Sequence, residues 1–193
     1  QEQDYNIWRQ LGNKGWGWND VLPYFLKAEN QERGESEFHK IGGPLSVSDP
    51  RIKLDLLETF IDAAEEKGIP KVNDFNTGDN FGCGYFQVTE KNGFRCSTAV
   101  GYLNPIKNRK NLKIEINCHV KKINFDGKKA VSVSYWKDEK LFTVVTNKEI
   151  ILSAGSIGTP QILQTSGIGD ANKLSKLGIN IIKNSKGVGK NLQ

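Results

Sequence analysis

Apolar residues recur at helical spacing through the first third of the chain. Leu54, Leu57 and Ile61 lie three to four residues apart, which is the repeat of an amphipathic helix, and Gly68 ends that helix. The pattern of residues 1–67 therefore predicts helices joined by loops. The expected elements are a short amphipathic piece at 4–11, a helix at 20–29 capped by Asn19 with Pro23 in its first turn, a strand at 45–47 and the helix that contains Leu54.

Residues 71–111 show no sustained repeat and are rich in Asp, Asn and Gly. The stretch predicts a strand at 85–89 and a short helix at 97–103 that Asn104 and Pro105 end. So long an irregular segment is either functional or a plain connector between two structured parts. Its composition favours neither interpretation.

Alternation of apolar and polar residues begins after residue 111 and predicts a β meander. The turns fall at Asp126-Gly127, a hairpin signal, and at residues 137–140. The strands are expected at 112–117, 120–125, 130–136 and 141–146.

The chain then changes from a strand pattern to a helix pattern. The apolar run at 149–153 predicts a buried strand. Thr159 and Pro160 suit a helix cap and a first helical residue, and Gly167 ends that helix. A short helix around Leu174 and a last strand at 179–182 complete the expected elements.

Composition excludes several classes of protein. The net charge of +5 comes from scattered lysines rather than from a basic stripe with stacking aromatics, so no nucleic-acid partner is expected. No apolar run is long enough for a transmembrane segment. The three cysteines and two histidines show no metal-ligand spacing, and the cysteines suit reduced thiols, so we expect no metal and a cytoplasmic protein, either free or at the periphery of a membrane.

The ends of the sequence predict a piece of a longer protein. Residue 1 is Gln, the chain contains no Met, and it stops at Gln193 without a closing element. No leader peptide is visible at the start.

Small residues follow the predicted buried strand at 149–153. Ser153, Ala154 and Gly155 lie between that strand and the next helix, where free backbone N–H groups and the positive helix end converge. Such a bend suits a phosphate or another ligand that touches the backbone. It suits equally a turn in which small residues only allow close packing. There is no GxGxxG fingerprint, GxSxG elbow or P-loop.

The run from Gly155 to Gly169 resembles the second signature of the glucose-methanol-choline (GMC) oxidoreductase family. Its small pair, its Ser/Thr-Pro, its two aliphatic residues and its Ser-Gly-aliphatic-Gly ending are all present. The resemblance extends over nearly the whole chain. It is nearest to the choline dehydrogenase-like bacterial branch of the family. The matching segments are Gly155-Ser156, Thr159-Pro160, Ile162-Leu163, Ser166-Gly167-Ile168-Gly169, residues 11–25, Gly42-Gly43-Pro44-Leu45, Asp74-Phe75-Asn76 with residues 82–87, residues 95–103 and residues 187–193.

The resemblance implies an FAD-dependent oxidoreductase that oxidises the CH–OH group of a small-molecule alcohol. The hydride goes to the flavin, and a histidine expected beyond residue 193 accepts the hydroxyl proton. The dinucleotide glycines are expected before residue 1. His39 and His119 do not match the family's catalytic motif, so no catalytic residue is assigned within the chain. The resemblance leaves the alcohol, the electron acceptor and the oligomeric state open.

The family's cofactor contacts carry over to four positions. Val120 resembles a valine whose backbone contacts the adenine end of FAD, and Ser153, Ala154 and Gly155 resemble the turn that lines the adenosine part. Four aromatic residues are expected to form a packed cluster rather than an active-site wall. They are Phe75, Phe81, Tyr85 and Phe86.

We therefore expect a mixed α+β and α/β fold, as a section of a two-domain FAD-dependent enzyme. Residues 1–111 would form mostly the substrate-binding or cap portion, and residues 112–193 mostly part of the FAD-binding domain, with a β meander and a strand-turn-helix unit. A non-catalytic binding or scaffold domain that kept the fold is the alternative. A nicotinamide-dependent oxidoreductase is weaker, because nothing in the chain recognises that cofactor.

Overall fold

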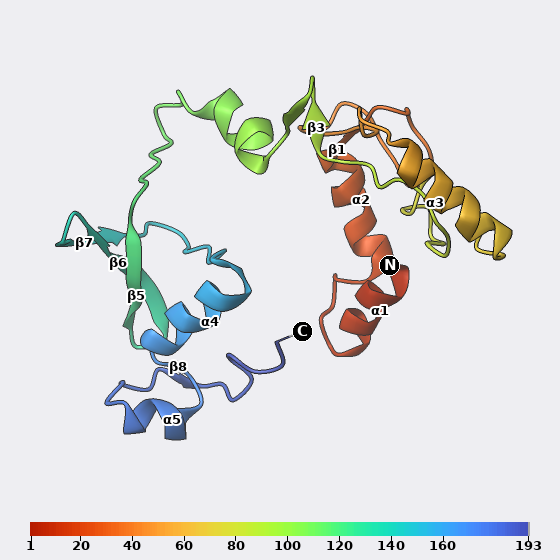
Figure 1. The fold of residues 1–193 in the computed structure, drawn as a ribbon. Helices are drawn as coiled ribbons and strands as arrows, with labels where there is room; N and C mark the ends of the chain where they lie inside the picture. The colour runs from red at the N-terminus through yellow and green to blue at the C-terminus, as the bar shows by residue number, and fades with distance from the viewer. Residues whose placement is uncertain (193) are drawn as a thin grey trace. The chain divides into compact units, whose positions relative to one another are not determined.

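The computed structural model describes residues 1–192, which form two compact units of mixed helix and strand. The first unit is Gln1–Lys113 and the second is Ile114–Gln193. Figure 1 shows helices dominating the first unit and a three-stranded sheet with helices in the second. The mixed α+β fold class expected from the sequence is confirmed.

Two aromatic-rich helices open the first unit, α1 (Glu2–Gln10) and α2 (Trp18–Ala28). Tyr5 of α1 packs against Trp18 and Phe25 of α2, with ring centroids 5.9 and 5.8 Å away. The cap of α2 is Gly17 rather than Asn19, because the Asp20 carboxylate accepts the Gly17 N–H at 3.0 Å and fixes the first turn two residues earlier.

Short ladders connect the remaining parts of the first unit. Strand β1 (Glu29–Gln31) pairs in parallel with β2 (Leu45–Val47), and β3 (Glu90–Lys91) pairs with β4 (Phe94–Arg95). Helix α3 (Asp55–Glu66) and two short helical turns, η1 (Ala99–Leu103) and η2 (Asn104–Ile106), complete it.

The strand expected at 85–89 is wrong. Only Val88 makes a bridge there, to Ser48, and the other bridge of this loop, between Cys83 and Lys71, lies before the expected strand.

The second unit contains the predicted meander. Strands β5 (His119–Asp126), β6 (Lys129–Lys137) and β7 (Lys140–Val145) form an antiparallel sheet in that order. On one face Asn124 donates to Ser132 and Ser134, at 2.9 and 2.8 Å, which satisfies these buried hydroxyls. Residues 112–117 are not a strand; they pair with no part of this sheet.

Helix α4 (Gly155–Thr165) begins earlier than the sequence predicts. Its cap is Ala154, so Thr159 and Pro160 lie inside the helix rather than at its start. A Cβ on Gly158 would lie 3.2 Å from the Ala154 Cβ, so glycine keeps that contact out of the first turn. The strand expected at 149–153 is also wrong, because that segment has no strand partner among residues 1–192, and Ile151 is 79% exposed.

The end of the second unit packs around Leu174. Strand β8 (Ile168–Gly169) pairs in parallel with β9 (Lys183–Asn184), and helix α5 (Ala171–Lys176) lies between them in sequence. The last strand therefore falls at 183–184 and not at 179–182, because Ile182 N–H and Lys183 N–H both donate to the Gly167 carbonyl and fix that register. Leu174 is 1% exposed.

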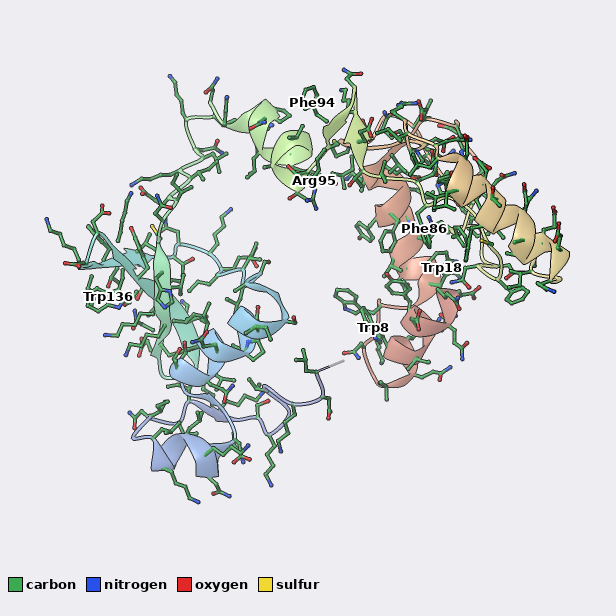
Figure 2. All side chains as sticks on the ribbon, viewed as in Figure 1. Trp8, Trp18, Phe86, Phe94, Arg95 and Trp136 are labelled. Atoms are coloured by element: carbon green, nitrogen blue, oxygen red, sulfur yellow. The ribbon has the colours of Figure 1, made fainter. Side chains whose placement is uncertain are left out.

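The chain leaves much apolar surface uncovered. Two compact domains of these sizes would expose about 11,000 Å² together, whereas the chain exposes 14,914 Å². In Figure 2 the labelled side chains of Trp8, Phe86, Phe94 and Trp136 project from the ribbon, and all four are more than a third exposed. No helix among the described residues is long and apolar enough to span a bilayer.

A matched pair of glycines tests the packing at the end of α4. Gly167 and Gly178 both have positive φ, +91° and +69°, so alanine is strained at either site. At Gly167 the new Cβ would also lie 2.2 Å from the Asn180 carbonyl, whereas at Gly178 it meets open space. We expect Gly178→Ala to lower the free energy of unfolding by about 1 kcal/mol. Gly167→Ala should lower it clearly more, as measured by thermal unfolding. Equal losses would contradict this packing.

Candidate cofactor-binding site

The bend at residues 153–155 is open. Ser153, Ala154 and Gly155 are all exposed, and a Cβ built on Gly155 meets no atom within 4 Å. Gly155 has φ +78°, a backbone conformation that suits glycine. A ligand can therefore lie directly against the main chain at this point.

The bend leads into a helix end that has no side-chain cap. No side chain caps the N-terminus of α4, although the Ala154 N–H donates to the Thr159 hydroxyl at 3.1 Å. The N–H groups of the first turn therefore point outward, beside the positive end of the helix dipole. This arrangement fits the phosphate or ribose oxygens of a nucleotide.

Val120 lies half-buried near the start of β5, opposite Tyr135 of β6. The register shifts between Val120 and Lys122, so a β-bulge lies beside the valine. Such bulges change the direction of neighbouring groups and often accompany functional sites. Next along the strand, the Lys121 carbonyl accepts a hydrogen bond from Thr165, at the far end of α4 from the bend.

Helix α4 thus connects the two parts of the expected FAD contact, one part at each end. Val120, Ser153, Ala154 and Gly155 stay predictions as FAD contacts. All four belong to the second unit, and their surroundings fit a nucleotide, because the bend is bare and Val120 sits next to the irregularity in its strand.

The first unit contains a cavity of about 490 Å³, which is large enough for a small molecule. Its walls carry five aromatic rings together with polar groups that include His39 and Asn76. The aromatic residues are Tyr5, Trp18, Phe25, Phe38 and Phe75.

The expected packed aromatic cluster is only partly present. Phe75 lines the cavity and packs on Phe86 with ring centroids 4.6 Å apart. Phe81 and Phe86 are otherwise open, with exposed fractions of 65% and 70%. Tyr85 lines a separate hollow of about 160 Å³.

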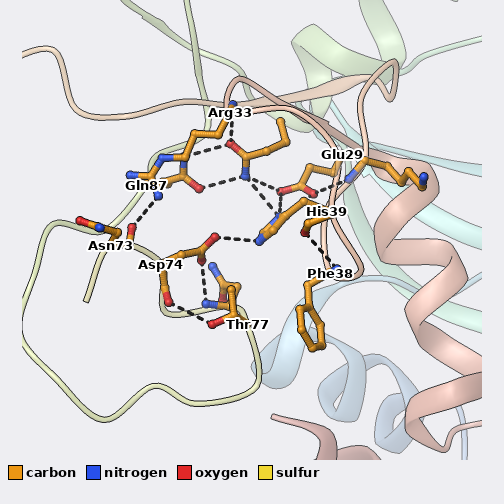
Figure 3. A network of polar contacts seen from close by, with 12 residues as sticks. Glu29, Arg33, Phe38, His39, Asn73, Asp74, Thr77 and Gln87 are labelled. Atoms are coloured by element: carbon orange, nitrogen blue, oxygen red, sulfur yellow. Dashed lines mark hydrogen bonds and ion pairs between the residues drawn. The ribbon is translucent and has the colours of Figure 1, made fainter. Parts of the chain in front are cut away.

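A buried ionic cluster forms one side of this cavity (Figure 3). His39 is 7% exposed, and its Nδ1 lies 2.9 Å from the Glu29 carboxylate. Its Nε2 lies 3.0 Å from the Asp74 carboxylate, close enough for an ion pair but poorly aligned for a hydrogen bond. The imidazole ring therefore lies between two carboxylates, one at each ring nitrogen. The cluster therefore fastens the loop that carries Phe75 to the start of β1.

Amide and guanidinium groups extend the cluster. Gln31 and Gln87 exchange reciprocal hydrogen bonds of 2.9 Å, and Gln87 also donates to Asp49 at 2.9 Å. Arg33 pairs with Asp49 at 2.7 Å and donates to the Asn73 carbonyl. Burial raises the pKa of Asp49, but the hydrogen bonds from Arg33 and Gln87 lower it more, so its pKa lies below the usual value.

No local sequence pattern predicts this cluster. Gln31, His39, Asp74 and Gln87 are separated by up to 56 residues, and no local motif contains them all. The available signal was that Asp74 and Gln87 belong to segments that match the family pattern.

Comparison with known proteins gives the family. A family model described as GMC oxidoreductase matches residues 1–193, the whole chain. The chain belongs to the GMC oxidoreductase family.

Named relatives and a solved structure agree with this membership. The chain is 39% identical over 191 residues to the mitochondrial choline dehydrogenase of Mus musculus, covering 99% of this chain and 32% of that protein. It is 40% identical over 194 residues to the oxygen-dependent choline dehydrogenase of Pectobacterium atrosepticum, covering 98% and 34%. An FAD-dependent oxidoreductase from Chaetomium thermophilum superposes with a TM-score of 0.92 at 34% identity, covering 100% and 36%. The chain thus spans about a third of the length of these GMC proteins.

Removing the histidine tests the ionic cluster. His39→Gln removes the ring whose two nitrogens lie 2.9 Å from the Glu29 carboxylate and 3.0 Å from the Asp74 carboxylate. We expect a loss of about 3 kcal/mol in the free energy of unfolding, measured by denaturant titration. Adding Asp74→Asn should recover part of the loss, because one unpaired charge is gone.

The control variant is Lys40→Gln, which removes the exposed pair between Lys40 and Glu35. That change should cost less than about 1 kcal/mol. A His39→Gln protein as stable as the Lys40→Gln protein would show that the cluster contributes nothing to the fold.

Proposed function

We propose that this chain is a section of an FAD-dependent enzyme that oxidises an alcohol to a carbonyl compound. Its first unit would contribute to the substrate side, and its second unit to the binding of the FAD nucleotide. Membership of the GMC family and the choline dehydrogenase relatives support this proposal. The proton-accepting histidine and the dinucleotide glycines would lie in the rest of the enzyme.

The single observation that carries the proposal is the bare backbone at Gly155. A Cβ at this position would meet nothing, and the adjoining N-terminus of α4 has no side-chain cap. These features leave room and free N–H donors for a nucleotide, as the family resemblance expects at this point.

FAD would supply the redox chemistry, accepting the hydride from the alcohol carbon. The residues of this chain would bind and place the cofactor and would not take part in the chemical step. Backbone groups at Val120 would meet the adenine, and the 153–155 bend would line the adenosine. In the first unit, the rings around the 490 Å³ cavity would provide apolar walls on the substrate side.

The substrate we propose is choline or a similar small alcohol. The support is the identity of 39–40% with choline dehydrogenases across nearly the whole chain. The cavity in the first unit fits this class in chemistry, because aromatic faces attract a quaternary ammonium group.

Anaerobic titration tests the activity. The full-length protein that contains this chain is expected to purify with bound flavin, and the oxidised-flavin absorbance should bleach when choline is added without oxygen. A set of primary alcohols tests the range of substrates. A flavin-free full-length protein, or a flavin that no alcohol reduces, would reject the proposal and favour a scaffold role.

Residues 1–193 expressed alone should bind FAD weakly or not at all and should turn over no alcohol. The physical reason is the large uncovered apolar surface, which leaves the bend without support on its outer side. Absorbance of the purified fragment near the flavin bands measures this. A yellow, active fragment would contradict the prediction.

Filling the bend tests the cofactor contact. Gly155→Val places a branched side chain where the nucleotide is expected to touch the main chain. FAD affinity should therefore fall by at least about tenfold in the full-length protein, which corresponds to the loss of about one good contact. Gly178→Val is the matched control, since it has a similar φ of +69° and open surroundings. Both variants should lose similar stability, but only Gly155→Val should release flavin in equilibrium dialysis.

A further inference from the structure

The sheet of the second unit has an open edge at β5. In the order β5-β6-β7, one side of β5 has no neighbouring strand among residues 1–192. On that side the Ile123 N–H donates to the Ser166 hydroxyl at 2.8 Å, and the Lys121 carbonyl accepts from Thr165 at 3.1 Å. Two consecutive residues at the end of α4 therefore take the place of a strand partner.

The Ser166 hydroxyl both donates and accepts a hydrogen bond in this contact. Ser166 is 6% exposed; its hydroxyl donates to the Ile162 carbonyl at 2.5 Å while it accepts from Ile123. The hydroxyl thus ties the last turn of α4 to the centre of β5. Alanine can make neither bond, whereas threonine retains the hydroxyl.

The residues after Ser166 hold the same end of the helix in place. Gly167 is buried, and its carbonyl accepts from Ile182 at 2.9 Å. A Cβ on Gly169 would lie 3.2 Å from Leu174 Cδ1, so the chain there is closely packed. The C-terminal end of α4 therefore has little freedom to shift unless the Ser166 contact changes.

A rigid helix connects this contact to the bend. The eleven residues of α4 span about 16 Å at a rise of 1.5 Å per residue. At its start the Thr159 hydroxyl accepts the Ala154 N–H and so ties the bend to the helix body. A shift of the far end is thus transmitted to the 153–155 bend.

We propose that Ser166 is a positioning residue for the nucleotide, which sets the 153–155 bend relative to Val120. Its hydroxyl faces β5 and the helix backbone, and it acts on the cofactor only through the two elements that it joins. This inference rests on the proposed function, because it takes the adenosine part of FAD to contact both Val120 and the bend.

Binding of ADP to the flavin-free full-length protein tests the inference. ADP carries the adenine, ribose and diphosphate of FAD without the flavin, so it reports on the adenosine side alone. Calorimetric titration should show Ser166→Ala binding both ADP and FAD about tenfold more weakly, equivalent to about one net hydrogen bond. Ser166→Thr should stay within about twofold of the parent. Ser175→Ala, an exposed serine of α5, should bind both ligands as the parent does.

Thr165→Val provides a second route if Ser166→Ala does not fold. Thr165 is exposed, so its substitution leaves the core intact, and it should weaken ADP in the same direction by a smaller factor. A Ser166→Ala protein with a lower melting temperature but unchanged ADP affinity would overturn the inference, as would a loss for FAD without a loss for ADP. A parent protein that binds neither ligand would overturn the proposed function as well, which separates the two failures.

Discussion

The hydrogen bond from the Ile123 N–H to the Ser166 hydroxyl is the contact on which the second unit depends. It covers the edge of β5, ends α4 and sets the direction in which the chain leaves the helix. This contact explains why the family signature ends in Ser-Gly-aliphatic-Gly. Ser166 satisfies the strand edge, and Gly167 adopts a left-handed conformation close to the Asn180 carbonyl. The end of the signature thus serves packing, while its beginning at Gly155 leaves backbone bare for a ligand.

In the first unit, contacts between His39 and two carboxylates join distant segments, as the Ser166 hydroxyl does in the second unit. His39 lies between Glu29 and Asp74, and thereby joins the start of β1 to the loop that carries Phe75. Such a cluster adds little net stability compared with apolar packing, but loss of one member leaves an unpaired buried charge. The geometry of the cavity wall therefore depends on all three residues together.

The sequence predicted what is local and failed where partners are distant. Alternation located β5, β6 and β7 of the meander, although the strand expected at 112–117 did not form. The strand expected at 149–153 did not form, since an apolar run becomes a strand only beside others, and no described residue pairs with it. Thr159 and Pro160 gave a local cap signal, but α4 starts at residue 155, and both residues lie inside the helix. The open bend was predictable from its small residues, whereas the roles of Ser166 and His39 were not, because their partners lie 43 and 35 residues away.

Polar groups in this chain find partners within their own unit, whereas many apolar side chains stay exposed. Hydrogen bonds at the bend, at Ser166 and at His39 all close within one unit. Apolar side chains do not: Ile151 and Ile157, on either side of the bend, are 79% and 67% exposed. Covering such a side chain contributes about 1.5–3 kcal/mol, which is comparable to the cost of ordering the few residues of the bend. The shape of the bend thus depends on contacts within the unit. Its rigidity depends on the part of the protein that covers these two isoleucines. In the proposed enzyme, binding of the nucleotide and assembly of the surrounding domain would then stabilise each other, because both act on the same few residues.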